Sequence, residues 1–232
     1  MIPASLRSRG ALPGYRSRTQ LASEPGCSLR RRAPAAPADG ARRPHPARPR
    51  RATCVGAIDY AALWEAHIAT EFTEKSADAA VATMVETATV NHVPTLMGGE
   101  GREDLRRFYA THFIPKMPDD VVIKPLNRTI APESQRVVDE FLFEFTHSVA
   151  MDWMLPGLAP TGRRVSVPFI VVVDFEGDKL KAERIYWDQA TVLKQLGLLP
   201  EGLPVAGAEQ SRKAESAGEV PSNQMLGAMS SR

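Results

Sequence analysis

The stretch QRVVDEFLFEFTHSVAM, residues 135–151, decides the fold of this 232-residue chain. Its apolar side chains recur at every second position, which is the period of a β-strand with one face against a core. Two polar side chains, Asp139 and His147, fall on the same parity as the apolar ones. The pattern therefore predicts a long strand whose buried face carries a carboxylate and an imidazole, with Asp139 a candidate ligand contact.

Three further segments show the same period of two. They are VVIKPLNRTIA (121–131), RVSVPFIVVVDFEG (164–177) and KLKAERIYWD (179–188). Short turns such as EGDK join these segments, which predicts an antiparallel meander of four strands. Apolar residues at helical spacing precede the strands, in residues 59–84 and 101–113. Helices first and strands afterwards indicate an α+β fold, with N-terminal helices covering one face of a strongly curved sheet.

The charge is distributed unevenly along the chain. Residues 1–54 hold twelve Arg, no Lys and two acids, Glu24 and Asp39, so this segment carries +10 (12 − 2). The other residues carry −8, from 17 basic (29 − 12) and 25 acidic (27 − 2) side chains. Because an acidic folded part offers no basic footprint for a polyanion, we expect no nucleic-acid partner.

Residues 1–54 have the composition of a targeting segment. They are rich in Arg, Ala, Pro and Ser, poor in acids, and lack the apolar run of a secretory signal. We interpret them as a transit peptide to the chloroplast, with the mitochondrion as the alternative destination and a solvated disordered arm as the non-targeting reading. Both cysteines, Cys27 and Cys54, lie in or at the edge of this arm, so the folded part has no disulfide.

The rest of the chain divides into a folded domain and a tail. We expect the domain to span residues 55–200, and residues 201–232, which are small and polar, to form a mostly irregular C-terminal tail. No stretch approaches the roughly 20 apolar residues of a membrane span, so no membrane partner is expected.

A carboxylate follows two aromatic residues at the end of the last predicted strand, in RIYWDQATVLKQLGLL (184–199). Alternation places Arg184, Tyr186 and Asp188 on the same face as Leu180, which we expect to be the inner face unless a bulge inverts it. Arg184 and Tyr186 are then candidate ligand contacts. In an apolar pocket Asp188 could act as an acid/base group. It is also a good helix N-cap, and both readings stay open at this point.

Histidines are the other candidates for proton transfer. His147 is either a core histidine bonded to Asp139 or a catalytic group, and His92, in a short strand before a proline, is a candidate for lining a cavity. His67 and His112 lie in the apolar stripes of predicted helices and are interpreted as packing residues. The histidines are scattered without ligand spacing, so the sequence suggests no metal site.

Two further side chains are candidates for ligand contacts. Arg128 would be a natural anion hook for a carboxylate ligand if it pointed inward, and otherwise is an exposed strand residue. Trp153 and its neighbour Asp152 precede a Pro-Gly turn. They form either a lid over a cavity or a hairpin loop anchored by the aromatic ring.

The order of these motifs resembles the SnoaL-like polyketide cyclases of the nuclear transport factor 2-like superfamily. The matching pieces span roughly residues 59–200 and are VNHVP, GGEGREDLRRFYATHFIPKMPDD, PTGRRVSVPFIVVVDFEGDKL and the closing Asp188 with ATVLKQLGLLP. The chain looks closest to a branch often named after dienelactone hydrolase or carboxymethylenebutenolidase, through FTHSVAMDWMLPG, IYWDQATVLKQLGLL and LPVAGAEQSRK. True dienelactone hydrolase activity is not expected, because the nucleophile elbow of α/β-hydrolases is missing.

The resemblance implies a cone-shaped sheet around a deep pocket, in a homodimer that pairs through the sheets. In the cyclases, an Asp at the position of Asp188 is the acid/base group of an aldol closure that uses no metal or cofactor. The strand matching VNHVP lines the same cavity, which points to Asn91 and His92. The segment 164–175 is apolar on both parities, which also favours a second subunit over the outer face.

Two functions follow as expectations. The first is cofactor-free acid/base chemistry, an isomerisation, cyclisation or hydration of a small apolar carbonyl compound in the pocket. The alternative is a non-catalytic module of the same fold that binds a small molecule or assembles with a protein partner. Catalysis needs at least two titratable groups converging on one empty volume, whereas binding needs only apolar walls.

Overall fold

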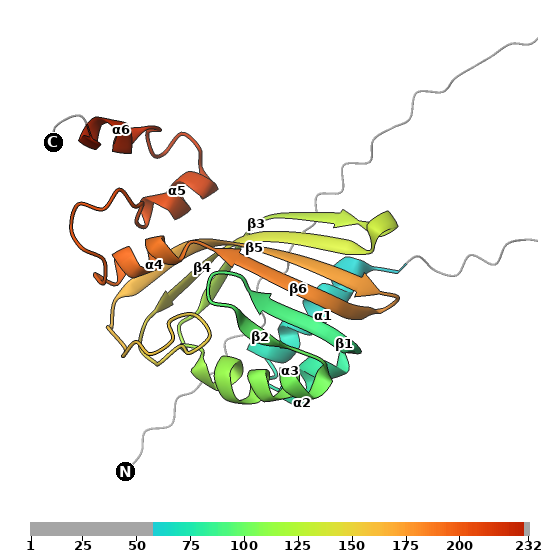
Figure 1. The fold of residues 1–232 in the computed structure, drawn as a ribbon. Helices are drawn as coiled ribbons and strands as arrows, with labels where there is room; N and C mark the ends of the chain where they lie inside the picture. The colour runs from blue at the N-terminus through green and yellow to red at the C-terminus, as the bar shows by residue number, and fades with distance from the viewer. Residues whose placement is uncertain (1–57, 230–232) are drawn as a thin grey trace, which may run out of the picture. The chain divides into compact units, whose positions relative to one another are not determined.

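The computed structural model describes residues 58–229, so the predicted N-terminal arm and its boundary at residue 54 lie outside the described part. Within it, helices and strands are arranged as an α+β fold, which confirms the fold class predicted from the sequence. Figure 1 shows the helices α1, α2 and α3 gathered on one side of a single curved sheet.

Six strands make up that sheet, in the order β2-β1-β6-β5-β4-β3. Their bounds are β1 Met84–His92, β2 Met97–Glu100, β3 Val122–Ala131, β4 Arg136–Thr146, β5 Arg164–Glu176 and β6 Lys179–Trp187. Strands β3 to β6 form the antiparallel meander that the alternation predicts. The sheet is not wholly antiparallel, however, because β1 pairs in parallel with β6.

Strand β2 is formed by a Gly-rich segment whose sequence, MGGE, would also suit a tight turn. This segment runs antiparallel to β1, with Gly98 opposite Asn91. Gly98 has φ +143°, and a Cβ there would lie 1.9 Å from the carbonyl oxygen of Val90. Glycine is therefore required because the two backbones approach so closely.

The helices on the concave side begin where the sequence predicts. They are α1 (Tyr60–Phe72), α2 (Ala77–Ala82) and α3 (Arg102–Phe108). Asp59 caps α1 by accepting from the Ala62 amide at 3.1 Å, and Ser76 caps α2 in the same way. Helix α3 runs on into a π-helical turn, η1 (Tyr109–Phe113), and then a 3-10 turn, η2 (Ile114–Lys116).

Aromatic side chains fill the space between these helices and the sheet. Phe143 and Phe145 of β4, Trp64 of α1, Tyr109 of η1 and Trp153 of the β4–β5 loop are all buried. Each large apolar side chain buried in this way contributes about 1.5–3 kcal/mol to the stability of the folded state. This core fixes the position of every polar group that shares the interior.

A bulge in β6 reverses the orientation expected for its side chains. Ala182 pairs with Asp174 but Leu180 pairs with Phe175, so Lys181 is an extra residue in β6. Beyond it Glu183, Ile185 and Trp187 are the buried residues of β6. The prediction that Arg184 and Tyr186 point inward is therefore wrong.

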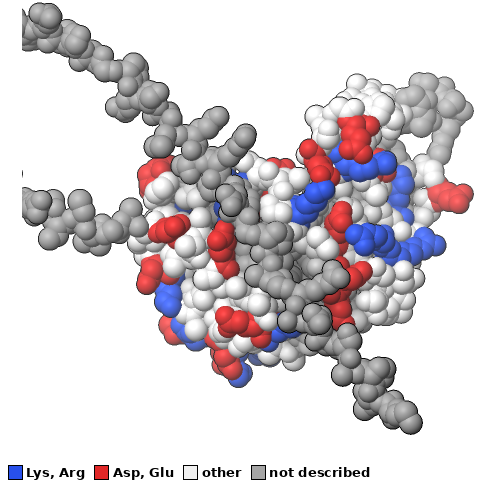
Figure 2. Space-filling model, turned by 180° about the vertical axis from the view of Figure 1, so that it is seen from behind, with Lys and Arg blue, Asp and Glu red and all other residues white. Residues whose placement is uncertain are grey.

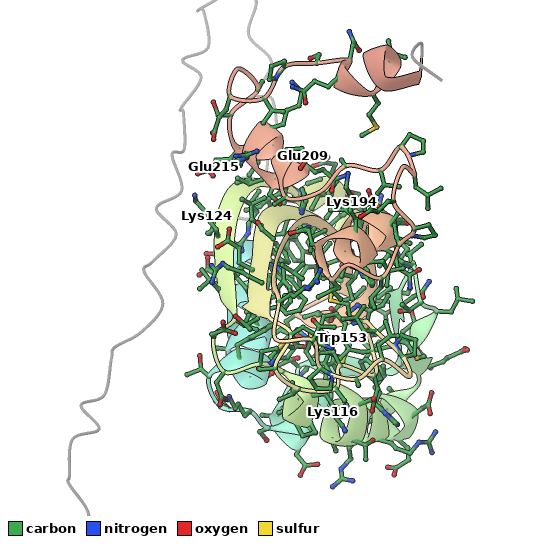
Figure 3. The ribbon with its side chains drawn as sticks, turned by 90° about the vertical axis from the view of Figure 1, so that its left-hand side faces the viewer. Lys116, Lys124, Trp153, Lys194, Glu209 and Glu215 are labelled. Carbon is green, nitrogen blue, oxygen red and sulfur yellow. The ribbon has the colours of Figure 1, made fainter. Side chains whose placement is uncertain are left out.

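The C-terminal segment contains short helices. Helix α4 (Gln189–Gln195) follows β6 directly, and the tail contains α5 (Glu209–Glu215), joined to β3 by an ion pair between Lys124 and Glu215, and α6 (Gln224–Met229). Figure 3 shows Lys124 and Glu215 side by side. Leu142, on the outer parity of β4, is only 2% exposed. The tail thus covers part of the outer face of the sheet.

The surface carries both signs of charge. Figure 2 shows acidic and basic side chains interspersed on one face of the described unit. Within residues 58–229 no helix combines the length and the apolar character needed to cross a bilayer.

Candidate functional site

A cluster of ionisable side chains lies in the interior between α1 and β6. The Nε2 atom of His67 is 3.1 Å from Oε1 of Glu71, one turn further along α1, and 3.0 Å from Oε1 of Glu183 on β6. The Nδ1 atom of the same ring is 2.6 Å from Oγ1 of Thr83, and the hydroxyl of Tyr109 is 3.5 Å from Nε2. We call His67, Glu71, Glu183 and Tyr109 the His67 cluster; all four are buried.

Burial and mutual charge set the protonation of the His67 cluster. Burial alone would lower the pKa of His67, but the nearby charges of Glu183 and Glu71 outweigh it and raise this pKa to about 10. Burial raises the pKa of the Glu183 carboxyl, against the opposing effect of His67. Burial, then the two carboxylates, raises the pKa of Tyr109, so its phenol stays neutral. His67 is therefore the cationic member of the cluster, beside two carboxyl groups.

A second buried polar group involves two of the predicted ligand contacts. Arg128 does point inward, but its Nε and NH2 atoms bind the carboxylate of Asp139 at 3.0 and 2.7 Å. A third nitrogen, NH1, lies 2.8 Å from Glu65, and Trp64 Nε1 donates to Asp139 at 2.9 Å. Arg128 is thus engaged by protein carboxylates, which leaves it poorly placed as an anion hook.

His92 is sealed among aromatic rings. Its ring centroid lies 4.7 Å from that of Trp153 and 5.7 Å from that of Phe113, and its Nδ1 has no hydrogen-bond partner among the described residues. Burial lowers the pKa of His92 to about 3, so the ring is neutral. Trp153 is itself only 1% exposed, and of the two readings of its loop the structure supports the anchored hairpin.

His147 lies just beyond the end of β4 and is fully buried. Its Nδ1 accepts from the Thr161 amide at 3.3 Å, whereas Nε2 has no partner within the described part of the chain. His147 does not form the expected bond to Asp139, because the Asp139 carboxylate accepts hydrogen bonds from Arg128 instead. Burial lowers the pKa of His147, as expected for a core histidine.

Three predicted ligand contacts lie on the outer face of the sheet. Asn91 pairs with Arg184 in the β1–β6 register, on the opposite parity to buried His92. Arg184 forms an ion pair with Asp174 at 2.8 Å, and Tyr186 is 42% exposed. The structure therefore does not bring Asn91, Arg184 and Tyr186 together with the interior groups.

Asp188 is the N-cap of α4. Its Oδ1 accepts from the amides of Ala190 and Thr191 at 2.9 and 3.2 Å, and its Oδ2 accepts from Gln210 Nε2 of α5 at 2.9 Å. Partial burial would raise the pKa of Asp188, but these hydrogen bonds, with one from the Thr191 side chain, outweigh it and lower the pKa. The geometry supports the capping interpretation. Through Gln210, the same carboxylate also ties α5 to the start of α4.

An open pocket of about 430 Å³ lies between β2, the α3–η1 run and the β4–β5 loop. Its lining residues are Met97, Gly98, Asp104, Arg107, Phe108, His112, Asp152, Pro156 and Gly157, and we call it the β2–η1 pocket. At its wall, Nδ1 of His112 is 3.6 Å from Oδ2 of Asp152. The same oxygen is 3.7 Å from Nζ of Lys116, which is not a lining residue. This pocket brings two titratable groups to one empty volume.

Sequence reasoning missed the groups that the structure brings together. His67 and Glu71 are four residues apart on one helix, a spacing that places two side chains on one face, but the histidine was interpreted as packing. Glu183 could not be found, because only the bulge at Lys181 turns it inward. His112 was also expected to pack, yet its side chain in the π-helical turn is 54% exposed.

With the fold and these groups described, the family of the chain is shown by comparison. The model of the SnoaL-like polyketide cyclase family matches residues 65–196, which is more than half of the chain. The chain therefore belongs to this family, and the resemblance seen in its motifs is confirmed. No curated protein matches the chain.

Solved structures with a similar fold come from several bacteria. A putative SnoaL-like polyketide cyclase from Jannaschia sp. CCS1 is 19% identical, with a TM-score of 0.45 over 60% of this chain and 94% of that one. A hypothetical protein from Catenulispora acidiphila, with a ketosteroid isomerase-like fold, is 18% identical, with a TM-score of 0.45 over 59% and 93%. AclR from Streptomyces galilaeus, a putative hydroxylase, is 15% identical, with a TM-score of 0.45 over 61% and 87%.

Proposed function

We propose that this SnoaL-like protein is an enzyme that performs cofactor-free acid/base chemistry on a small apolar carbonyl compound. The reaction class is an isomerisation, a cyclisation or a hydration. Membership of the cyclase family supports this class, and the chemistry is placed in the β2–η1 pocket. The predicted catalytic set of Asp188, His147 and His92 is not part of the proposal, because Asp188 is a cap and the two histidines are sealed in the core.

The observation that carries the proposal is the pair His112 and Asp152 at the wall of a pocket of about 430 Å³. That volume falls within the roughly 300–1,000 Å³ typical of small-molecule sites. The apolar side chains of Met97, Phe108 and Pro156 suit an apolar substrate. His112 also lies in a π-helical turn, and such turns occur frequently at functional sites.

The pocket supplies groups for the two halves of an enolisation. A histidine oriented by a carboxylate can remove a proton next to a carbonyl, and the negative charge of Asp152 stabilises the imidazolium that forms. The cation of Arg107, which lines the pocket, can stabilise the charge that develops on the substrate oxygen.

Exchange of protons for deuterium next to a carbonyl tests this assignment without knowledge of the substrate. A panel of small enolisable ketones is incubated with the protein in D₂O and followed by NMR. We expect wild type to accelerate exchange of at least one ketone, and His112→Gln and Asp152→Asn to reduce the rate by about 10²–10⁴-fold. Asp178→Asn, an exposed Asp in the β5–β6 turn, is the matched control and should keep the wild-type rate.

A second candidate function is ligand binding without catalysis. The interior of the domain favours this function, because Arg128 and Asp139 bind each other there instead of serving as reactive groups. The same NMR samples separate the two functions. Chemical-shift changes at the β2–η1 pocket without any catalysed exchange would favour a binding module over an enzyme.

A further inference from the structure

We propose that His67, Glu71 and Glu183 bind a divalent transition-metal ion, such as Mn²⁺, Fe²⁺ or Zn²⁺, which ties helix α1 to strand β6. This site is separate from the β2–η1 pocket, whose lining includes none of the three residues. The inference therefore stands independently of the proposed function. It assigns the ion a structural role, because all three side chains are buried.

The donor atoms are placed for such an ion. One nitrogen of His67 and one carboxylate oxygen each of Glu71 and Glu183 lie within 4.8 Å of one another. The oxygens are 3.1 and 3.0 Å from Nε2. Two ligand bonds of about 2.1 Å at right angles place their donor atoms about 3.0 Å apart, so the spacing suits one face of an octahedral ion. Imidazole and carboxylate together are ligands suited to first-row transition metals.

The other side of the imidazole is held as a metal ligand requires. The hydroxyl of Thr83 donates to the carbonyl oxygen of Ala80 at 2.7 Å, so its oxygen is free to accept from Nδ1–H of His67 at 2.6 Å. This bond orients the ring and leaves Nε2 to face the carboxylates. Metal-binding histidines are usually fixed by such a bond from the second ring nitrogen.

Glu183 gives an independent indication that the cluster lacks a partner. Its side chain is 4% exposed, and its Oε1 has no hydrogen-bond partner in the described part of the chain, although it lies 3.0 Å from Nε2 of His67. A buried carboxylate oxygen without a hydrogen bond is unfavourable. Because this oxygen points at the ring nitrogen, a cation held between the two atoms would satisfy it.

Charge balance favours the same occupant. Two carboxyl groups, those of Glu71 and Glu183, converge on a single imidazole in the core. A divalent ion with two carboxylate ligands and one neutral imidazole ligand is balanced in charge. Because buried charges are costly unless they are paired, such an ion suits this set of side chains.

Manganese binding tests the site directly. The full chain is stripped of metal with a chelator, dialysed and titrated with Mn²⁺, and the signal of the free ion is followed by electron paramagnetic resonance. Mn²⁺ is chosen because it prefers oxygen ligands to the thiols of Cys27 and Cys54. We expect one ion per chain, and a rise in Tm of roughly 5–10 °C at about 100 times Kd.

Two variants locate the ion, and one controls for the change of charge. Glu183→Gln removes a ligand and should weaken Kd at least about 10-fold. Thr83→Val leaves all three ligands in place but removes the orienting bond, together with the hydroxyl's bond to Ala80, and should weaken Kd by about 10–100-fold. Glu176→Gln, an exposed Glu on the same sheet, should leave Kd unchanged. Thr83→Val keeps the side-chain shape, so it decides the question if Glu183→Gln does not fold. Absence of binding at millimolar Mn²⁺, or equal binding by wild type, Glu183→Gln and Thr83→Val, would overturn the proposal.

Discussion

Two carboxylates on one stretch of chain, Glu183 and Asp188, have opposite environments. Glu183 lies on the buried face of β6, 4% exposed, and one of its oxygens has no hydrogen bond among the described residues. Asp188, at the end of the same strand, accepts hydrogen bonds from two amides and from Gln210. Burial raises the pKa of the first carboxyl, while hydrogen bonds lower the pKa of the second.

The difference shows that partners, more than burial or sequence context, determine what a carboxylate does. Asp188 follows two aromatic residues and looks reactive in the sequence, but donors fix it in its charged form. Glu183 stands in an ordinary strand pattern, but its contacts with His67 and Glu71 place it in a shared titrating group. Substitutions in the His67 cluster and at Asp188 should therefore change the stability of the protein by different amounts.

The largest effect is expected at the positive member of the His67 cluster. His67→Phe removes the cation that lies, among the described residues, beside the buried carboxyl groups of Glu71 and Glu183, and breaking a buried pair in this way costs about 3–5 kcal/mol. Glu183→Gln leaves His67 with Glu71 as its partner and should change the free energy of unfolding by less than about 1 kcal/mol. Urea unfolding in the presence of a chelator measures both. Equal losses for the two variants would show that the charge balance is not what stabilises the cluster.

The pH dependence of stability should come partly from His92, a buried group with no charged partner. Its folded pKa of about 3 lies below the unfolded value of about 6.5, so between these values the unfolded chain binds one more proton. The contribution of the neutral His92 ring to the free energy of unfolding is complete above about pH 6.5. It is lost as the pH falls toward 3, at about 1.4 kcal/mol per pH unit.

His92→Phe tests this contribution, because the ring can pack against Phe113 and Trp153 as the imidazole does. Unfolding free energies are measured between pH 4 and 6. Their slope against pH should be smaller for His92→Phe than for wild type by about 1.4 kcal/mol per pH unit, the slope of one bound proton. An unchanged slope would mean that His92 is protonated in the folded protein.

A smaller effect is expected at Asp188, where the side chain acts as a cap. Asp188→Ala removes the cap of α4 and should cost about 0.5–2 kcal/mol, while Asp188→Asn caps about as well and should cost little. Thermal unfolding measures stability, and the deuterium-exchange assay measures activity. A large loss of exchange in a stable Asp188→Asn protein would restore the acid/base assignment.

The outer face of the sheet is expected to affect assembly but not stability. Ile170 and Tyr186 are each 42% exposed there, on the side opposite Glu183, and the tail covers only part of this face. We propose that a second copy covers the rest. Light scattering should report about twice the monomer mass for wild type and a monomer for Ile170→Asp. A wild-type monomer at micromolar concentration would contradict the proposal.

The smallest effect on the folded part is expected from removal of residues 1–54. We propose that this arm is a transit peptide to the chloroplast, or alternatively to the mitochondrion, and that the mature protein lacks it. N-terminal sequencing of protein isolated from its native cell measures the mature start. A mature protein that begins at Met1 or Ile2 would contradict the targeting proposal. The unfolding free energy of residues 55–232 should match that of the full chain.

Local patterns in the sequence were enough to predict the framework. Alternation over 135–151 buries Asp139 and His147 as expected, and Asp59 and Ser76 cap the first two helices. These features depend on neighbours a few residues away, so the sequence contains their causes. The short strand β2 was missed because two adjacent glycines also suit a turn, and only pairing with β1 distinguishes the two.

The candidate sites depended on contacts between distant segments. A single extra residue, Lys181, turns Glu183 inward and Tyr186 outward, and alternation cannot reveal it. His67 became a charged group because β6 brings Glu183 within 3.0 Å, across more than a hundred residues of chain.

The sequence by itself determined the α+β class, the order of the long strands and of the helices before them, and the family, because periodicity and capping are local. Only the tertiary structure decided which polar side chains meet. The free energy of a buried charge is set by partners that the chain brings in from elsewhere.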